Sequence, residues 1–229
     1  AARLAPELAG RLARLEASPE RRATLERLAA DLVGWGSQRD AKRWLSVLER
    51  VLRAEESVRP GSRRLLRAVA VSLHKLMAYK DEYEVARLMT DPDGMAAARE
   101  IAVPGSRVAW KLHPPLLRAL GLRRKITVGS WATPAIRWLA RARFLRGTPF
   151  DPFGRARIRR LERALPGEYV ETLDQALAIL DEARFEAVVE LAELPDVVRG
   201  YEDLKLARIE SYRKELSAAR ASLGLEAIS

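Results

Sequence analysis

The stretch Arg64–Leu88, RLLRAVAVSLHKLMAYKDEYEVARL, decides the fold class. Its apolar residues recur at helical spacing and form one stripe: Leu65, Val69, Leu73, Leu76 and Tyr83. Turn signals bound it on both sides, Pro60-Gly61-Ser62 before it and Asp91-Pro92-Asp93-Gly94 after it. The pattern predicts a single helix of about seven turns.

Helical signals continue on both sides of this stretch. Ser18-Pro19-Glu20 is typical of a helix N-terminus, and Gly34-Trp35-Gly36 ends that helix. Further helices are expected at about 38–56, from Pro134, after Asp151-Pro152, around 173–180 and 185–191, and at 201–223 before Gly224.

Two short segments, 107–112 and 125–128, are instead rich in strand-forming residues and predict a hairpin with a long connection. No internal repeat or clear interdomain linker interrupts the chain. The sequence therefore predicts a mainly α, multi-helix single domain over residues 1–229, with one short β-hairpin near 107–128. Residues 1–28 are expected to form a peripheral helix.

The composition is that of a globular chain. Apolar residues make up 48% and charged residues 31% of the sequence, which is enough apolar material for a core. No apolar run approaches the roughly 18 residues of a membrane span, and no charged-then-apolar leader opens the chain. Because Cys is absent, a disulfide scaffold and a thiolate-bound zinc or iron–sulfur cluster are excluded. We expect a cytoplasmic chain without membrane contact.

The net charge of +10 is unevenly distributed along the chain. Residues 1–60 carry +3, residues 61–120 carry +4, residues 121–160 carry +10 and residues 161–229 carry −7. Three interpretations are open: the acidic segment neutralises the basic one within a domain, the basic segment docks on an acidic protein, or it binds nucleic acid. No nucleic-acid-binding motif accompanies the charge, and the seven-residue spacing of Trp131 and Trp138 is typical of a helix core.

Motifs of several enzyme classes are missing. A phosphate loop needs spaced glycines followed by Lys-Ser/Thr, and the sequence has no such combination. The two histidines, His74 and His113, belong to different elements, so we expect packing or surface roles and no metal site. We assign no catalytic, cofactor-binding or metal-binding residue.

One dense polar segment is the second half of the long predicted helix. Tyr79 and Tyr83 are one turn apart, and Glu84 is spaced for helical ion pairs with Lys80 and Arg87. The pattern is typical of an ion-paired helix face. It could serve proton transfer only if the group were buried.

A second dense segment is Arg146–Gly154, RGTPFDPFG. Its prolines and flanking glycines predict a rigid, ordered elbow between helices. Asp151 followed by Pro152 is typical of a helix start, so we expect Asp151 to cap the next helix.

The blocks Lys75–Leu88 and Arg146–Gly154 together resemble the C-terminal region of the fused indolepyruvate ferredoxin oxidoreductases, a branch of the 2-oxoacid:acceptor oxidoreductases. That region has long been treated as a domain of unknown function. Three further stretches agree: Lys111–Leu117, Leu161–Leu165 with Glu168-Tyr169, and Val189–Ala192 leading to Val198-Arg199-Gly200-Tyr201. The resemblance covers about Leu28 to Ile209 and is strongest over residues 62–209.

Two stretches depart from the family pattern. Glu202-Asp203 stands where the family usually has Gly-His, and Val128–Ala132 stands where it has an aromatic-Gly-Pro-Trp-Met run. Any role of that family histidine is therefore missing here or supplied elsewhere.

The resemblance implies a role beside the oxidative decarboxylation of aryl pyruvates to aryl-acetyl-CoA. Thiamine diphosphate, Mg and iron–sulfur clusters are then expected in partner domains, because this chain lacks Cys, and without Asn it cannot form the family's Gly-Asp-Gly…Asn motif. We expect a non-catalytic accessory or assembly domain, or subunit, whose partners are the catalytic domains of such an oxidoreductase. The alternatives are a small basic nucleic-acid-binding module, which an open arginine stripe would favour, and an independent enzyme, which a closed pocket around Tyr79 would favour.

The candidate interface or functional residues come from the two dense segments, the basic segment and the C-terminal region. They are Lys75, Tyr79, Lys80, Glu82, Tyr83, Glu84, Arg123, Arg124, Lys125, Arg137, Arg141, Arg146, Asp151 and Arg199.

Overall fold

The structure, a computed structural model, describes residues 3–100, 109–112, 126–200 and 202–226. It is mainly α-helical, which confirms the predicted fold class, and it forms two compact units. Unit 1 contains residues 1–78 and 161–229, and unit 2 contains residues 79–160. A single domain over the whole chain stays a prediction. In the described ranges, no helix combines the length and apolarity that a membrane crossing requires.

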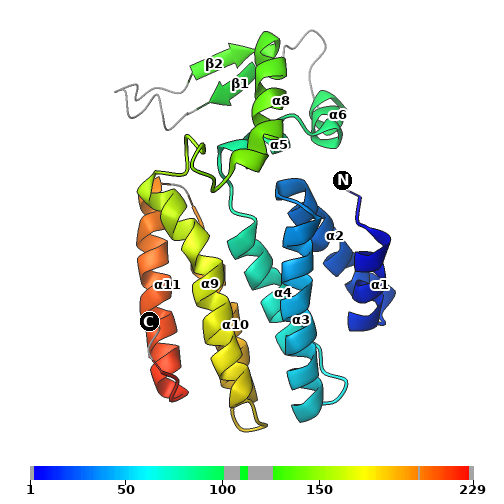
Figure 1. The fold of residues 1–229 in the computed structure, drawn as a ribbon, viewed down its shortest axis with the longest axis vertical. Helices are drawn as coiled ribbons and strands as arrows, with labels where there is room; N and C mark the ends of the chain where they lie inside the picture. The colour runs from blue at the N-terminus through cyan, green and yellow to red at the C-terminus, as the bar shows by residue number, and fades with distance from the viewer. Residues whose placement is uncertain (1–2, 101–108, 113–125, 201, 227–229) are drawn as a thin grey trace. The chain divides into compact units, whose positions relative to one another are not determined.

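The N-terminal part of unit 1 consists of α1 (Pro6–Leu15), α2 (Pro19–Trp35), α3 (Gln38–Val58) and α4 (Arg64–Met77) (Figure 1). α3 packs against each of the other three. Residues 1–28, expected as one peripheral helix, contain α1 and the start of α2, and the apolar side chains of α1 are buried in the core. Trp44 of α3 is fully buried, and its indole Nε1 donates to the Ala70 carbonyl oxygen at 3.0 Å.

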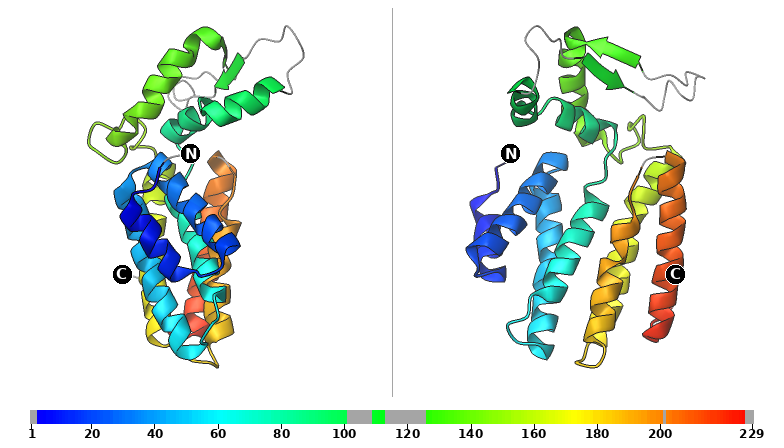
Figure 2. Two further views of the ribbon diagram at one scale, coloured as in Figure 1. Left: turned by 90° about the vertical axis from the view of Figure 1, so that its right-hand side faces the viewer. Right: turned by 180° about the vertical axis from the view of Figure 1, so that it is seen from behind.

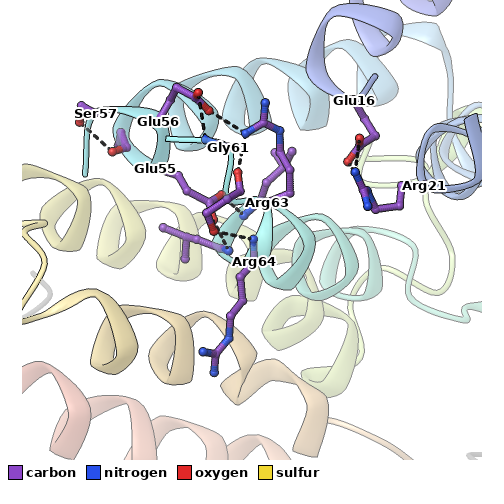
Figure 3. Close-up of polar contacts among 12 residues, drawn as sticks. Glu16, Arg21, Glu55, Glu56, Ser57, Gly61, Arg63 and Arg64 are labelled. Carbon is purple, nitrogen blue, oxygen red and sulfur yellow. Dashed lines mark hydrogen bonds and ion pairs between the residues drawn. The ribbon is translucent and has the colours of Figure 1, made fainter. Parts of the chain in front are cut away.

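A buried carboxylate holds the turn between α3 and α4 (Figure 3). Glu55 is 0% exposed, and its two oxygens accept hydrogen bonds from the backbone N–H groups of Leu65 and Leu66 at 2.9 and 2.8 Å. These are N–H groups of the first turn of α4, which have no partner within the helix, and a negative charge is favourable there. Gly61 makes the turn itself with a φ of 79°, as Pro60-Gly61-Ser62 predicts.

The C-terminal part of unit 1 consists of α9 (Arg157–Ala178) from Leu161 onward, α10 (Phe185–Glu193), the 3₁₀ helix η3 (Leu194–Val197) and α11 (Glu202–Ser222). The three α-helices run side by side, and α10 packs against α4 (Figures 1 and 2). The Tyr169 hydroxyl, which is fully buried, donates to the Ala192 carbonyl oxygen at 2.9 Å. Gly224, with a φ of 68°, follows the last helix as predicted.

Ion pairs within unit 1 join the acidic C-terminal third to the N-terminal helices. Asp174 pairs with Arg50 at 2.9 Å, and Glu186 pairs with Arg59 at 2.7 Å. Unit 1 has 24 basic and 24 acidic residues, whereas unit 2 has 17 basic and 7 acidic residues. The whole formal net charge of +10 therefore belongs to unit 2.

Unit 2 contains α5 (Glu82–Met89), α6 (Pro92–Glu100), β1 (Ala109–Leu112), β2 (Ile126–Gly129), η1 (Ser130–Ala132), α8 (Thr133–Arg141) and η2 (Ala142–Leu145). The two strands form the predicted antiparallel hairpin, with Ala109 opposite Gly129 and Leu112 opposite Ile126. α5 packs against α8 over a small core that includes Ala86 and Ile136.

The predicted seven-turn helix over residues 64–88 is wrong. α4 ends at Met77 and α5 begins at Glu82, so the apolar stripe continues across a break. Asp81 is the N-cap of α5, because its Oδ1 accepts a hydrogen bond from the Glu84 backbone N–H at 2.8 Å. An Asp side chain that bonds the backbone in this way starts a new helix instead of continuing the old one.

Candidate functional site

The two dense polar segments of the sequence meet within unit 2. Asp81 and Arg146, 65 residues apart, form a bidentate ion pair in which the guanidinium Nη2 lies 2.9 Å from Oδ1 and Nε contacts Oδ2. The side chains are only 3% and 8% exposed, respectively. A paired, forked contact of this kind fixes both position and orientation. Asp81 thus caps α5 and anchors Arg146 at the same time.

Asp151 does not cap the next helix, because α9 begins only at Arg157. Its buried carboxylate instead accepts hydrogen bonds from three groups. Oδ1 accepts from the Tyr83 hydroxyl and from the Phe153 backbone N–H, both at 3.1 Å, and Oδ2 accepts from the Gly147 backbone N–H at 2.9 Å. The Asp-Pro pattern therefore marks an acid that organises its own loop and holds it to α5.

Ring contacts complete this arrangement. The Arg146 guanidinium carbon lies 5.7 Å from the centre of the Tyr83 ring, and the Phe153 ring meets the same ring edge-on at 5.3 Å. We call Asp81, Tyr83, Arg146 and Asp151 the buried cluster. Its four members come from both dense segments.

Tyr83 is buried and faces a carboxylate, which decides its protonation. Burial raises the pKa of the Tyr83 hydroxyl well above its usual range, and the charge of Asp151 raises it further. The hydroxyl therefore keeps its proton near neutral pH and acts as a hydrogen-bond donor. Such a group is suited to holding a loop and poorly suited to acting as a base.

The neighbouring acids of α5 are also paired with arginines. Glu84 is buried and forms a bidentate pair with Arg87, at 2.6 and 2.8 Å. Glu82 pairs with Arg159 at 2.9 Å, and Arg159 also donates to the Lys80 carbonyl oxygen at 3.3 Å. In the described residues the predicted Lys80–Glu84 ion pair is not formed, because Lys80 precedes α5 and is exposed.

Tyr79 is buried beside this region, but Lys75 is not part of it. Lys75 belongs to unit 1, where its Nζ donates to the Asp196 backbone carbonyl oxygen at 2.6 Å and contacts the Asp196 carboxylate at 3.1 Å. Burial lowers the pKa of Lys75. Arg199, largely exposed, contacts the same Asp196. These two candidates stabilise η3 of unit 1 and do not join the buried cluster.

The two histidines lie in different parts of the chain, and three of the basic candidates lie outside the described residues. His74 Nε2 lies 3.1 Å from Asp31 Oδ2 in unit 1, a packing role as expected. His113, Arg123, Arg124 and Lys125 lie outside the described residues. Across the described ranges, no group of three or more His, Asp or Glu side chains is placed to hold a metal ion.

The aromatic residues of the basic segment contradict the sequence interpretation. Trp131 and Trp138 have the spacing of a helix core, yet they are 78% and 68% exposed. Arg137 and Arg141 of α8, the helix that contains Trp138, are exposed as well. The signal that could have corrected this is a second stripe, Ala132, Ile136 and Ala140, which repeats every four residues and is the buried one. Beyond α8, Phe144 and Phe150 are also exposed, at 75% and 81%.

A family model described as a family of unknown function (DUF6537) matches residues 21–218, which is most of the chain. No match was found among the curated proteins or among the solved structures.

Proposed function

The chain belongs to the DUF6537 family, and we propose that it is a non-catalytic accessory domain or subunit that assembles with the catalytic domains of an indolepyruvate ferredoxin oxidoreductase-like enzyme. In this proposal the oxidative decarboxylation of aryl pyruvates takes place on the partner polypeptide. The chain acts in the cytoplasm, in keeping with its lack of Cys.

The observation that carries the proposal concerns the two blocks that most resemble that enzyme family, Lys75–Leu88 and Arg146–Gly154. Their polar side chains are paired with one another in the buried cluster: Arg146 with Asp81, and Tyr83 with Asp151. Side chains that are already paired and buried stabilise a scaffold, whereas catalytic groups must face a substrate. This supports a structural role for both blocks.

The residues of this chain do not fit the cofactors of the partner enzyme. An iron–sulfur cluster needs cysteine thiolates, and the chain has no Cys. The thiamine diphosphate motif named above needs an Asn, which the chain also lacks. We therefore assign thiamine diphosphate, Mg and the clusters to the partner.

The experiment is to purify the full chain anaerobically, alone and co-expressed with the catalytic polypeptide of such an oxidoreductase from the same source. We expect the chain alone to contain no iron and no thiamine diphosphate, and we expect co-elution with the catalytic polypeptide in a fixed ratio. Stoichiometric iron in the isolated chain would overturn the proposal, and so would separate elution of the two polypeptides at micromolar concentration.

A second candidate function has one specific observation in its favour. Exposed tryptophans beside exposed arginines, as at Trp138 and Arg137, can stack on bases and neutralise phosphates. In unit 2, however, three other arginines are used internally, because Arg87, Arg146 and Arg159 pair with buried or nearly buried acids. Fewer cations then remain to follow a phosphate backbone, so we rank nucleic-acid binding second.

A further inference from the structure

The continuous segment of η1 and α8, residues 130–141, has apolar residues on two opposite faces. Its inner face packs on α5 through Ala132, Ile136 and Ala140. Its outer side carries Trp131 and Trp138, which leave 78% and 68% of their surface in water. Large aromatic side chains with this exposure are typical of interaction sites, because burying them against a partner is strongly favourable.

The outer residues follow the spacing by which a helix enters a groove. Trp131 of η1 and Pro134, Ala135 and Trp138 of α8 occupy positions i, i+3, i+4 and i+7, and the two tryptophans and the proline are apolar anchors around the small Ala135. All four are exposed. This is the anchor pattern of a helix that lies in an apolar groove of another protein. About two helical turns along η1 and α8 separate the tryptophans.

The same face is positively charged, which favours a partner with a negatively charged surface. Arg137 and Arg141 are one turn apart, both exposed, and neither forms an ion pair with any residue that the structure describes. The surrounding unit 2 carries 17 basic and 7 acidic residues. A partner surface with carboxylates beside its groove would match this charge and bind faster and more selectively.

We propose that the outer face of η1 and α8, formed by Trp131, Pro134, Ala135, Arg137, Trp138 and Arg141, docks into an apolar groove rimmed by Asp and Glu side chains on the catalytic polypeptide. This inference rests on the proposed accessory function and names its surface. A protein groove fits better than single-stranded nucleic acid. The tryptophans project from a packed helix, whereas proteins that bind single strands bring bases to aromatic side chains along a basic groove.

The test measures the affinity of the full chain for the catalytic polypeptide by isothermal titration calorimetry. One variant carries Trp131→Ala and Trp138→Ala, and a second carries Arg137→Glu and Arg141→Glu. The matched control carries Val71→Ala and Leu204→Ala, which are exposed apolar residues of unit 1, at 52% and 58%. Circular dichroism and thermal melting check that each variant folds, which we expect because the changed side chains are exposed.

We expect the tryptophan variant to raise Kd by about 30-fold or more, the size of a hot-spot effect. The arginine variant should weaken binding mainly at low salt, and the control should bind like the unchanged chain. A photo-cross-linking residue placed at Trp138 should link to the catalytic polypeptide at a peptide rich in Asp and Glu.

Other outcomes would overturn the inference in distinguishable ways. Binding that both α8 variants leave unchanged would refute this surface and spare the accessory function. Cross-links from position 138 only to the same chain would also refute the surface. If the unchanged chain fails to bind the catalytic polypeptide at all, the proposed function itself fails. Submicromolar binding of mixed-sequence RNA near 0.15 M salt, if it is lost in the tryptophan variant, would show that this surface binds nucleic acid and would overturn the inference.

Discussion

Replacing Asp151 by Ala tests whether the buried cluster holds unit 2 together. The change removes the acceptor of hydrogen bonds from the Tyr83 hydroxyl and from the Gly147 and Phe153 backbone N–H groups. A hydrogen bond to a charged acceptor contributes about 1.5–3 kcal/mol, and buried donors left without a partner are costly. Three donors lose their charged acceptor together and their effects do not fully add, so we expect the free energy of unfolding to fall by about 3–5 kcal/mol. An ordinary helix cap would cost only about 1 kcal/mol.

The assay is urea unfolding followed by circular dichroism, with hydrogen exchange to locate the loss in unit 2. Tyr83→Phe removes one of the three bonds and should cost about 1–2 kcal/mol. In the double variant the two effects should not add, because the residues contact each other. Asp174→Ala is the control, since its exposed pair with Arg50 is worth less than about 1 kcal/mol. A loss of about 1 kcal/mol or less for Asp151→Ala, or full additivity with Tyr83→Phe, would refute the assigned role.

Three further outcomes are expected. Arg146→Ala should lower the free energy of unfolding by about 3–5 kcal/mol, because it leaves the buried Asp81 carboxylate unpaired. Adding Asp81→Asn to this variant should recover part of the loss in the same urea assay. Hydrogen bonding from Arg21 lowers the pKa of the Glu16 carboxyl. The stability that the ionised Glu16 contributes is therefore present above its unfolded-state pKa of about 4.3 and is lost as the pH falls through the lower folded-state pKa. Glu16→Gln should flatten the stability–pH curve below about pH 4, and thermal melting across pH 2–7 measures this. Duplex DNA and mixed-sequence RNA should bind the unchanged chain only weakly at 0.15 M salt, and a salt series by fluorescence anisotropy checks this.

Helix ends that depend on local chemistry could be predicted from the sequence. Pro19 after an extended Ser18 starts α2, and Gly224 with a positive φ follows α11, because both effects come from the residue's own backbone. The hairpin strands near 107–112 and 125–128 were also placed to within about two residues, which is the usual uncertainty of element ends.

Features that depend on distant partners could not be predicted. Asp81 interrupts the predicted helix because it caps α5 and pairs with Arg146, 65 residues later, and no local pattern contains that partner. Asp151 carries the sequence signal of a helix cap, but its carboxylate bonds Tyr83 instead. Periodicity likewise shows that Trp138 lies on a helix face without showing which of two apolar faces is buried.

The sequence shows that a basic segment is followed by an acidic one, but only the fold shows which residues the acidic side chains pair with. The acidic stretch that follows the basic segment in sequence belongs to unit 1, where Asp174 and Glu186 pair with N-terminal arginines. Unit 1 is therefore formally neutral, and the excess positive charge is a property of unit 2. This separation is what makes an acidic partner for unit 2 a physical expectation.

The central claim is that this chain docks on a catalytic polypeptide, and sedimentation velocity of the two purified polypeptides tests it most directly. At about 1 µM each and physiological salt, a docking module with a buried aromatic anchor should give one faster-sedimenting species in a fixed ratio. The Trp131→Ala/Trp138→Ala variant should give less of this species and more of the free polypeptides at the same concentration. Two separate boundaries for the unchanged chain, at this concentration and at tenfold higher, would contradict the account.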